Sequence, residues 1–110
     1  MKGTQLGEFE ELVLLTAGAL YPEAYGVAVM NEIKEETGRS VNISAIHSAL
    51  RRLESKGFVK SDMGGATNER GGRRKRYFEL TAYGKTALDD SQEIRMKLYK
   101  RIPNIGFSQS

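Results

Sequence analysis

The chain has 110 residues, and its 17 Lys and Arg against 14 Asp and Glu give a formal net charge of +3. It has no cysteine and one histidine, which excludes disulfides, thiolate chemistry and histidine-rich metal sites, so we expect neither a metal nor a cofactor. The length fits one small domain. Because the sequence shows no long apolar run and no signal-peptide layout, we expect a cytoplasmic protein.

Apolar residues recur every three or four positions in the first half of the chain, as one buried helix face requires. They predict helices at about 7–20, 25–37 and 44–56. The Tyr21-Pro22 step ends the first, because proline disfavours a helical conformation at the preceding residue. Gly38 ends the second. Asn42 or Ser44 caps the third, since the side-chain oxygen of either can accept a hydrogen bond from a free amide of the first turn.

A hairpin follows the third helix, with strands at about 58–63 and 74–80. Phe78 and Leu80 alternate with polar neighbours, which is the period of a strand with one buried face. Thr81 then caps a fourth helix at about 82–101, which is longer than the rest of so small a domain can cover.

Three helices followed by a two-stranded hairpin is the element order of a winged helix-turn-helix, a mainly α (α+β) fold. In that fold the third helix enters the DNA major groove and the hairpin forms a wing that contacts the flanking DNA. We therefore expect a DNA-binding domain at 1–81, a dimerisation helix at 82–102 and a flexible tail at 103–110.

The third helix turns small and basic side chains outward once Ile46, Leu50 and Leu53 face the core. Small residues let a helix approach base edges, and arginine can bind a phosphate or a guanine edge with two hydrogen bonds. A plain solvated face is an equally good interpretation of this helix alone. The single histidine has no second His or Cys as partner, so a phosphate contact or an ordinary surface position is expected before a catalytic role. The candidate residues are Asn42, Ser44, Ala45, His47, Ser48, Arg51 and Arg52.

The segment GGATNERGGRRKRYFEL, residues 64–80, combines glycines with a basic run. A nucleotide-phosphate loop is disfavoured, because these glycines lead into a strand and neither G-x-G-x-x-G nor a G-K-[ST] ending is present. A solvated loop and an RNA-binding or nuclear-localisation segment remain alternatives. We favour a DNA-contacting wing, because five positive charges fall within seven positions and Glu69 alone opposes them. These charges belong to Arg70, Arg73, Arg74, Lys75 and Arg76.

Three stretches form a combined pattern: YG at 25–26, IHSALRRLESKGFV at 46–59 and GGRRKRYFELTAYG at 71–84. With them, the chain from Leu6 to about Leu98 resembles PadR-type bacterial transcriptional regulators, in particular their short, single-domain form. The resemblance implies a homodimeric, nucleoid-associated repressor whose third helix reads a pseudo-palindromic operator and whose wing touches the DNA backbone. One departure is His47, where the family commonly has a tyrosine that reaches the DNA backbone.

The same resemblance implies that the last helix pairs the subunits, often with help from the first. The residues expected at the dimer interface are Phe9, Leu12, Leu88, Ser91, Ile94, Leu98 and Ile102. The alternative for the stripe on the fourth helix is packing within one chain. Many relatives respond to small aromatic or drug-like effectors at this interface. Tyr99, Met96 and Phe9 are candidates to line such a site, and the absence of tryptophan excludes an indole platform.

Two other functions are weighed against a regulator. A winged helix that docks a protein without binding DNA is suggested by the long fourth helix. An enzyme is disfavoured, because no nucleophile–base pair, metal cluster or paired carboxylate stands out in the sequence. Asp89 and Asp90 are adjacent on a helix and so point in different directions.

Overall fold

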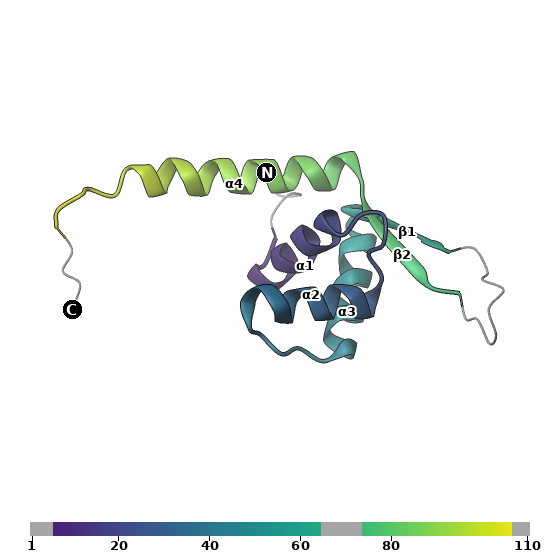
Figure 1. The fold of residues 1–110 in the computed structure, drawn as a ribbon. Helices are drawn as coiled ribbons and strands as arrows, with labels where there is room; N and C mark the ends of the chain where they lie inside the picture. Colours follow the sequence, from purple (N-terminus) through teal and green to yellow (C-terminus); the bar gives the residue numbers. More distant parts are fainter. Residues whose placement is uncertain (1–5, 65–73, 107–110) are drawn as a thin grey trace.

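The structure is a computed structural model that describes residues 6–64 and 74–106. In these ranges the element order is α1 (Glu8–Ala19), α2 (Gly26–Thr37), α3 (Ile43–Ser55), β1 (Val59–Met63), β2 (Arg76–Leu80) and α4 (Ala82–Lys100). Figure 1 shows the three short helices packed together, the hairpin extending to one side and α4 to the other. The winged helix-turn-helix expected from the sequence is confirmed, with each element within about two residues of its predicted bounds.

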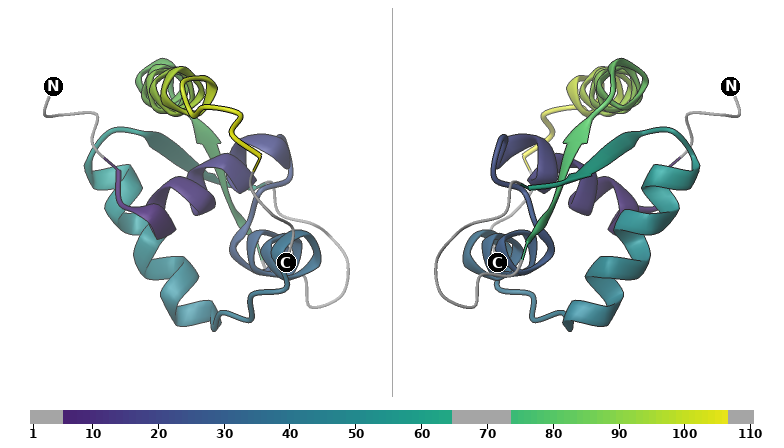
Figure 2. Two further views of the ribbon diagram at one scale, coloured as in Figure 1. Left: turned by 90° about the vertical axis from the view of Figure 1, so that its left-hand side faces the viewer. Right: turned by 90° about the vertical axis from the view of Figure 1, so that its right-hand side faces the viewer.

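The core lies among α1, α2, α3 and the hairpin. The predicted inner stripe of α3 is confirmed, because Ile46, Leu50 and Leu53 are all fully buried. The end-on views place α1 between α4 on one side and α2 with α3 on the other (Figure 2). The largest fully buried side chains come from α1, α2, α3 and the start of the hairpin, and they are Phe58, Leu14, Ile33, Ile46, Leu50, Leu53, Val13, Val29 and Val59.

The helix ends follow the expected capping chemistry. Asn42, and not Ser44, caps α3, with its side-chain oxygen accepting a hydrogen bond from the Ala45 amide at 2.8 Å. Thr81 caps α4 in the same way, accepting from the Gly84 amide at 3.0 Å. Gly38 follows α2 with a φ of 78°, a left-handed conformation that glycine adopts without steric cost.

The sheet is a single antiparallel pair in which Lys60 faces Glu79 and Asp62 faces Tyr77. The outer edge of β2 is also used, because the Phe78 amide donates a hydrogen bond to the Ala24 carbonyl at 2.9 Å. This bond fixes the hairpin to the segment that leads into α2.

Helix α4 begins against the core and then leaves it (Figure 1). Gly84 lies directly against the Phe58 carbonyl, and Leu88 is only 6% exposed. Leu88, expected at a dimer interface, therefore packs within its own chain, which was the alternative for that position. Further along, Ile94 and Leu98 are 57% and 54% exposed, as the predicted excess length of this helix requires. Residues 103–106 follow without helix or strand, and 107–110 of the expected tail lie outside the described residues.

Candidate nucleic-acid interface

The outward face of α3 carries the side chains expected to meet DNA. Ser44, His47 and Arg51 are exposed, and their spacing of three and four residues places them along one face of the helix. Ala45 and Ser48 are half-buried beside them. This face is small at its N-terminal end and basic at its C-terminal end, so it can lie close to a polyanion.

Arg52 has a different environment from Arg51. Its Nε lies 3.0 Å from Oε2 of Glu10, on α1, and Lys56 Nζ lies 2.9 Å from the other oxygen of that carboxylate. Burial raises the pKa of the Glu10 carboxyl, but hydrogen bonds from Lys56, Arg52 and the Gly7 amide together lower it below its ordinary value. Consecutive helix residues point about 100° apart, so Arg52 does not share the direction of Arg51. Arg52, expected as a DNA contact, is held against α1 by its ion pair with Glu10.

The base of the wing is basic and faces α3. Arg74, Lys75 and Arg76 are all exposed, and the Lys75 amine lies 4.3 Å from the centre of the Tyr25 ring. The Arg76 guanidinium donates to the Ser61 hydroxyl at 2.9 Å, and that hydroxyl donates to Glu54 of α3. Arg70 and Arg73, which complete the expected basic run, lie outside the described residues.

A groove of about 710 Å³ joins α3 to the wing. It brings together His47 and Arg51 of α3 with Arg74, Lys75 and Arg76. The first residues of α2, which were not expected at the site from the sequence, also line it. Gly26 is buried against the His47 imidazole, where a Cβ would lie 2.8 Å from Cδ2. The YG pair at 25–26 was part of the pattern that carries the family resemblance, but the pattern did not indicate that these residues lie in the groove.

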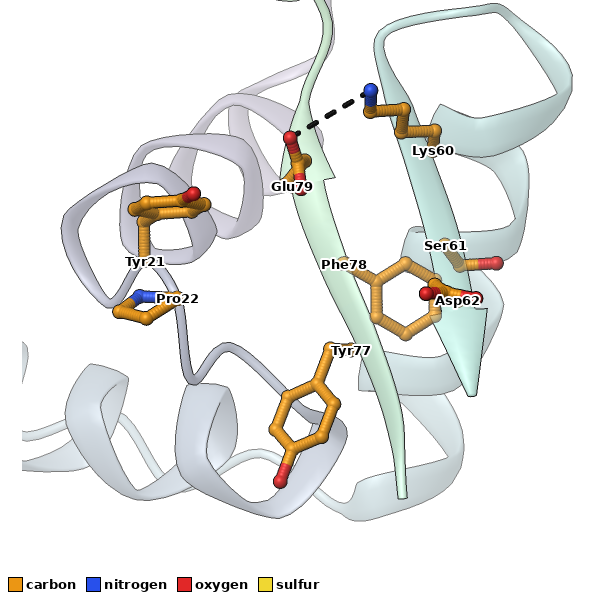
Figure 3. A pocket seen from close by; sticks show the side chains of 8 residues that line it. All are labelled: Tyr21, Pro22, Lys60, Ser61, Asp62, Tyr77, Phe78 and Glu79. Carbon is orange, nitrogen blue, oxygen red and sulfur yellow. Dashed lines mark ion pairs between the residues drawn. The ribbon is translucent and has the colours of Figure 1, made fainter. Parts of the chain in front are cut away.

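A second hollow, of about 410 Å³, lies on the other side of the hairpin (Figure 3). Tyr21 and Pro22 form one side, and residues 60–62 and 77–79 of the two strands form the other. Lys60 and Glu79 form an ion pair across the strands, with 3.7 Å between nitrogen and oxygen. Asp62 adds a further negative charge, so this side lacks the positive excess of the α3 face.

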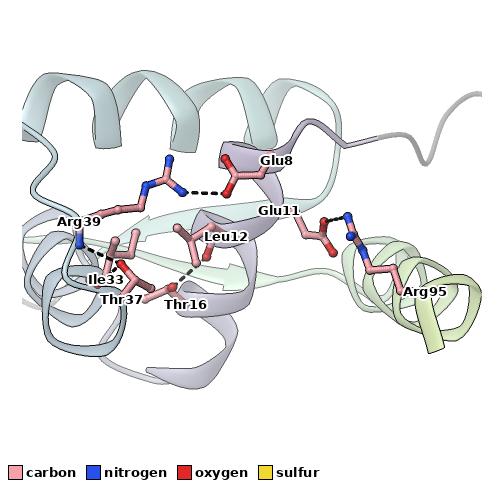
Figure 4. Close-up of polar contacts among 8 residues, drawn as sticks. All are labelled: Glu8, Glu11, Leu12, Thr16, Ile33, Thr37, Arg39 and Arg95. Atoms are coloured by element: carbon pink, nitrogen blue, oxygen red, sulfur yellow. Dashed lines mark hydrogen bonds and ion pairs between the residues drawn. The ribbon is translucent and has the colours of Figure 1, made fainter. Parts of the chain in front are cut away.

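Polar contacts with α1 hold the middle of α4, the expected dimer helix. The Glu11 carboxylate pairs with Arg95 at 2.9 Å (Figure 4) and accepts a hydrogen bond from the Ser91 hydroxyl at 3.0 Å. Ser91, expected at a dimer interface, is therefore engaged within its own chain. Phe9 and Leu12 are half-buried against the core, and the Arg39 guanidinium lies 5.5 Å from the centre of the Phe9 ring.

The exposed end of α4 presents an apolar surface. Met96, Leu98, Tyr99 and Ile102 line an open hollow of about 650 Å³, with Gln92 and Arg95 beside them. Phe9 is not among its lining residues. Across the described ranges, no cluster of three or more metal-ligating side chains is present, and no helix has the length and hydropathy to cross a membrane.

The fold, together with the basic groove between α3 and the wing, defines a winged helix-turn-helix protein of the nucleic-acid-binding type. A model of the transcriptional regulator PadR-like family matches residues 14–90, which is more than half of the chain. The chain therefore belongs to the PadR-like family of transcriptional regulators, which bind DNA and are not enzymes. No curated protein sequence matches it.

Solved structures of family members share the fold. A PadR-like transcription factor from Bacteroides fragilis has a TM-score of 0.72 at 19% identity, over 86% of this chain and 85% of that chain. A PadR-like regulator from Bacillus cereus has a TM-score of 0.71 at 16% identity, over 92% and 93%. Bacillus subtilis PadR in complex with operator DNA has a TM-score of 0.66 at 22% identity, over 87% of this chain and 59% of that chain.

Proposed function

We propose that the protein is a sequence-specific transcriptional repressor that binds a pseudo-palindromic operator as a homodimer. The observation that carries the proposal is the groove that joins Arg51 of α3 to Arg74 and Lys75 at the base of the wing. Its cationic side chains suit a DNA backbone, and α3 beside it presents small side chains suited to base edges. Bacillus subtilis PadR, which shares the fold, was solved with operator DNA, and this supports the same use of the fold here.

Each group of residues has its own role in this proposal. Ser44, Ala45 and Ser48 approach base edges in the major groove, with Asn42 at the start of the helix. Arg51 binds a guanine edge or a phosphate, and His47 a phosphate. The wing residues neutralise backbone phosphates and carry no sequence preference. They are Arg70, Arg73, Arg74, Lys75 and Arg76.

Salt dependence tests the wing. If five or six phosphates are contacted, the log–log slope of affinity against salt is about −4 to −5. The double variant that combines Arg73→Ala and Arg74→Ala should bind all DNA sequences more weakly and to the same degree. It should also reduce the size of that slope by about 2. The matched control is Lys34→Ala with Lys97→Ala, which removes two exposed charges outside the groove. An unchanged slope in the wing variant would remove the wing from the DNA interface.

Sequence preference tests α3. DNA that the wild-type protein enriches from random oligonucleotides supplies the operator, and an unrelated duplex supplies the reference. Ser48→Val or Arg51→Gln should reduce the ratio of the two affinities by about 5- to 150-fold, because each disturbed base contact is worth about 1–3 kcal/mol. A protein that binds both duplexes equally, or neither, would contradict sequence-specific binding. Failure to bind either one, with a partner protein co-purifying, would favour a protein-docking module.

The homodimer rests on the exposed end of α4. Ile94, Leu98 and Ile102 are each more than half exposed, and an unpaired apolar stripe of this kind marks an interaction surface. Light scattering should give the mass of two chains for the wild type and of one chain for Leu98→Lys. Glu93→Lys, on the polar side of α4, should remain a dimer. A wild-type monomer at micromolar concentration would overturn the dimer and the operator with half-sites about 34 Å apart.

The proposal includes a small apolar effector that releases the DNA. Met96 and Tyr99 line the open hollow on α4, whose volume is in the range of small-molecule sites. A titration of the dimer with planar aromatic compounds should shift the Met96 methyl resonance, and Tyr99→Ala should weaken that response. Binding that leaves both residues unaffected would place the effector elsewhere.

A further inference from the structure

Tyr25 connects α2 to the base of the wing through its aromatic ring. The residue precedes α2 and is half-buried. The Lys75 amine lies 4.3 Å from the centre of its ring, within the range of a cation–π contact. The same ring forms a T-shaped pair with the Tyr77 ring, with ring centres 5.8 Å apart and planes at 86°. Both contacts use the ring and not the hydroxyl.

The neighbouring backbone keeps these contacts in place. Ala24, one residue before Tyr25, accepts a hydrogen bond from the Phe78 amide at 2.9 Å, and the Gly64 amide donates to the Lys75 carbonyl at 2.6 Å. The Tyr77 ring lies against Gly64, where a Cβ would come within 2.8 Å of Cδ2. The segment around Lys75, just before β2, is therefore held from both sides where the wing leaves the domain.

We propose that Tyr25 is a positioning residue for the wing. Its ring holds the amine of Lys75 and the ring of Tyr77, and so sets the direction in which the basic segment meets DNA. The proposal rests on the proposed function, in which the wing contacts DNA. Because Lys75 is exposed, its amine otherwise samples many directions, and ordering it before binding lowers the cost of forming the complex.

In this proposal the aromatic ring of Tyr25 positions the wing and its hydroxyl does not. Two substitutions at Tyr25 separate the contribution of the ring from that of the hydroxyl. Tyr25→Leu removes the ring, and operator affinity should fall about 5- to 10-fold, tenfold being about 1.4 kcal/mol. Tyr25→Phe keeps both ring contacts and should restore affinity to within about twofold of wild type. If Phe were as weak as Leu, a hydroxyl contact with DNA would replace the positioning role.

A double variant tests whether Tyr25 acts on DNA binding through Lys75. Lys75→Gln should also weaken binding, and the double variant, Tyr25→Leu combined with Lys75→Gln, should lose clearly less affinity than the product of the two single losses, because both substitutions remove the contact between Tyr25 and Lys75. Losses that multiply in the double variant would show that the two residues act separately and overturn the proposal. Tyr21→Leu is the matched control, since Tyr21 lies outside the groove and should bind as wild type.

A measurement without DNA separates this proposal from the proposed function. In the wild-type protein the Lys75 ε-methylene protons should be shifted upfield by the Tyr25 ring, and the shift should persist in Tyr25→Phe. Absence of the shift in wild type would overturn the ring contact, even if Tyr25→Leu does not fold. Presence of the shift in a protein that fails to bind DNA would instead refute the proposed function.

Discussion

Glu11 of α1 and Arg95 of α4 form an ion pair, with 2.9 Å between Oε1 and Nη2. The preceding residue, Glu10, makes matching contacts with Arg52 and Lys56 of α3. Both glutamates are 8% exposed, although they stand in the first turn of a helix. Two consecutive carboxylates thus link α1 to α3 on one side and to α4 on the other.

Removing the link to α4 should cost stability mainly through the buried partner. Glu11→Ala should lower the free energy of unfolding by about 1–2 kcal/mol, and Arg95→Ala by about 0.5 kcal/mol, because exposed ion-pair partners contribute little. Urea denaturation measures both. Glu93→Ala, an exposed glutamate of α4, should have no effect beyond error. Equal losses at Glu11 and Glu93 would mean that the link contributes nothing.

The link to α3 should be pH-dependent. The pKa of the Glu10 carboxyl is below its ordinary value of 4.5, since hydrogen bonds from Lys56 and Arg52 outweigh the effect of burial. A depressed folded-state pKa gives stability that is fully present above about 4.5 and is lost as pH falls through the lower folded value. Glu10→Gln should therefore be less stable than wild type at pH 7 by about 1–2 kcal/mol. In urea denaturation the difference should shrink as the pH is lowered below 4.5, and a difference independent of pH would contradict this assignment.

Gly84 should not tolerate a side chain. A Cβ there would collide with the Phe58 carbonyl oxygen and lie 3.0 Å from its carbon, and backbone atoms cannot rotate away. Gly84→Ala should destabilise the protein by about 2–3 kcal/mol, in the range of overpacked sites. Thr86→Ala, at an exposed position of the same helix, should be neutral or slightly stabilising. Thermal unfolding compares them, and a stable Gly84→Ala would mean that α4 shifts without cost.

Gly26 should be sensitive in binding more than in stability. A Cβ at this position meets the end of the His47 side chain, which is exposed and can rotate away. Gly26→Ala should lower stability by less than about 1 kcal/mol but displace the imidazole from the groove, with a loss of operator affinity of about threefold. In a His47→Ala background the added methyl should have little further effect on binding. A full additional loss there would show that His47 does not transmit the change.

The sequence predicted the parts of the fold that depend on neighbouring residues. The inner stripe of α3 and the Thr81 cap follow from spacing and short-range hydrogen bonds, and the structure confirmed both. Asn42 and Ser44 were equally good capping residues for α3 by residue type, and the structure shows that Asn42 is the cap. Side-chain contacts between residues far apart in the sequence could not be predicted, because a local sequence pattern does not include the distant partner.

The glutamates of α1 are the clearest case. The stretch EFEEL is typical of a solvated first turn, yet Glu10 meets Arg52 42 positions later and Glu11 meets Arg95 84 positions later. Arg51 and Arg52 had the same expected role, and only the packing of α1 on α3 separates them. Tyr25 was noted for its neighbour Gly26, while its contact with Lys75 depends on how the hairpin folds back onto α2.

The exposed end of α4 has a consequence for the amount of protein in a cell. With Tyr99 69% and Leu98 54% exposed, the apolar side of this helix is completed by a second copy in the proposed dimer. While the dimer predominates, association adds to the free energy of unfolding, and each tenfold dilution lowers that free energy by about 1.4 kcal/mol per dimer. The chain is then least stable when it is scarce, so falling synthesis lowers both the number of molecules and the folded fraction among them.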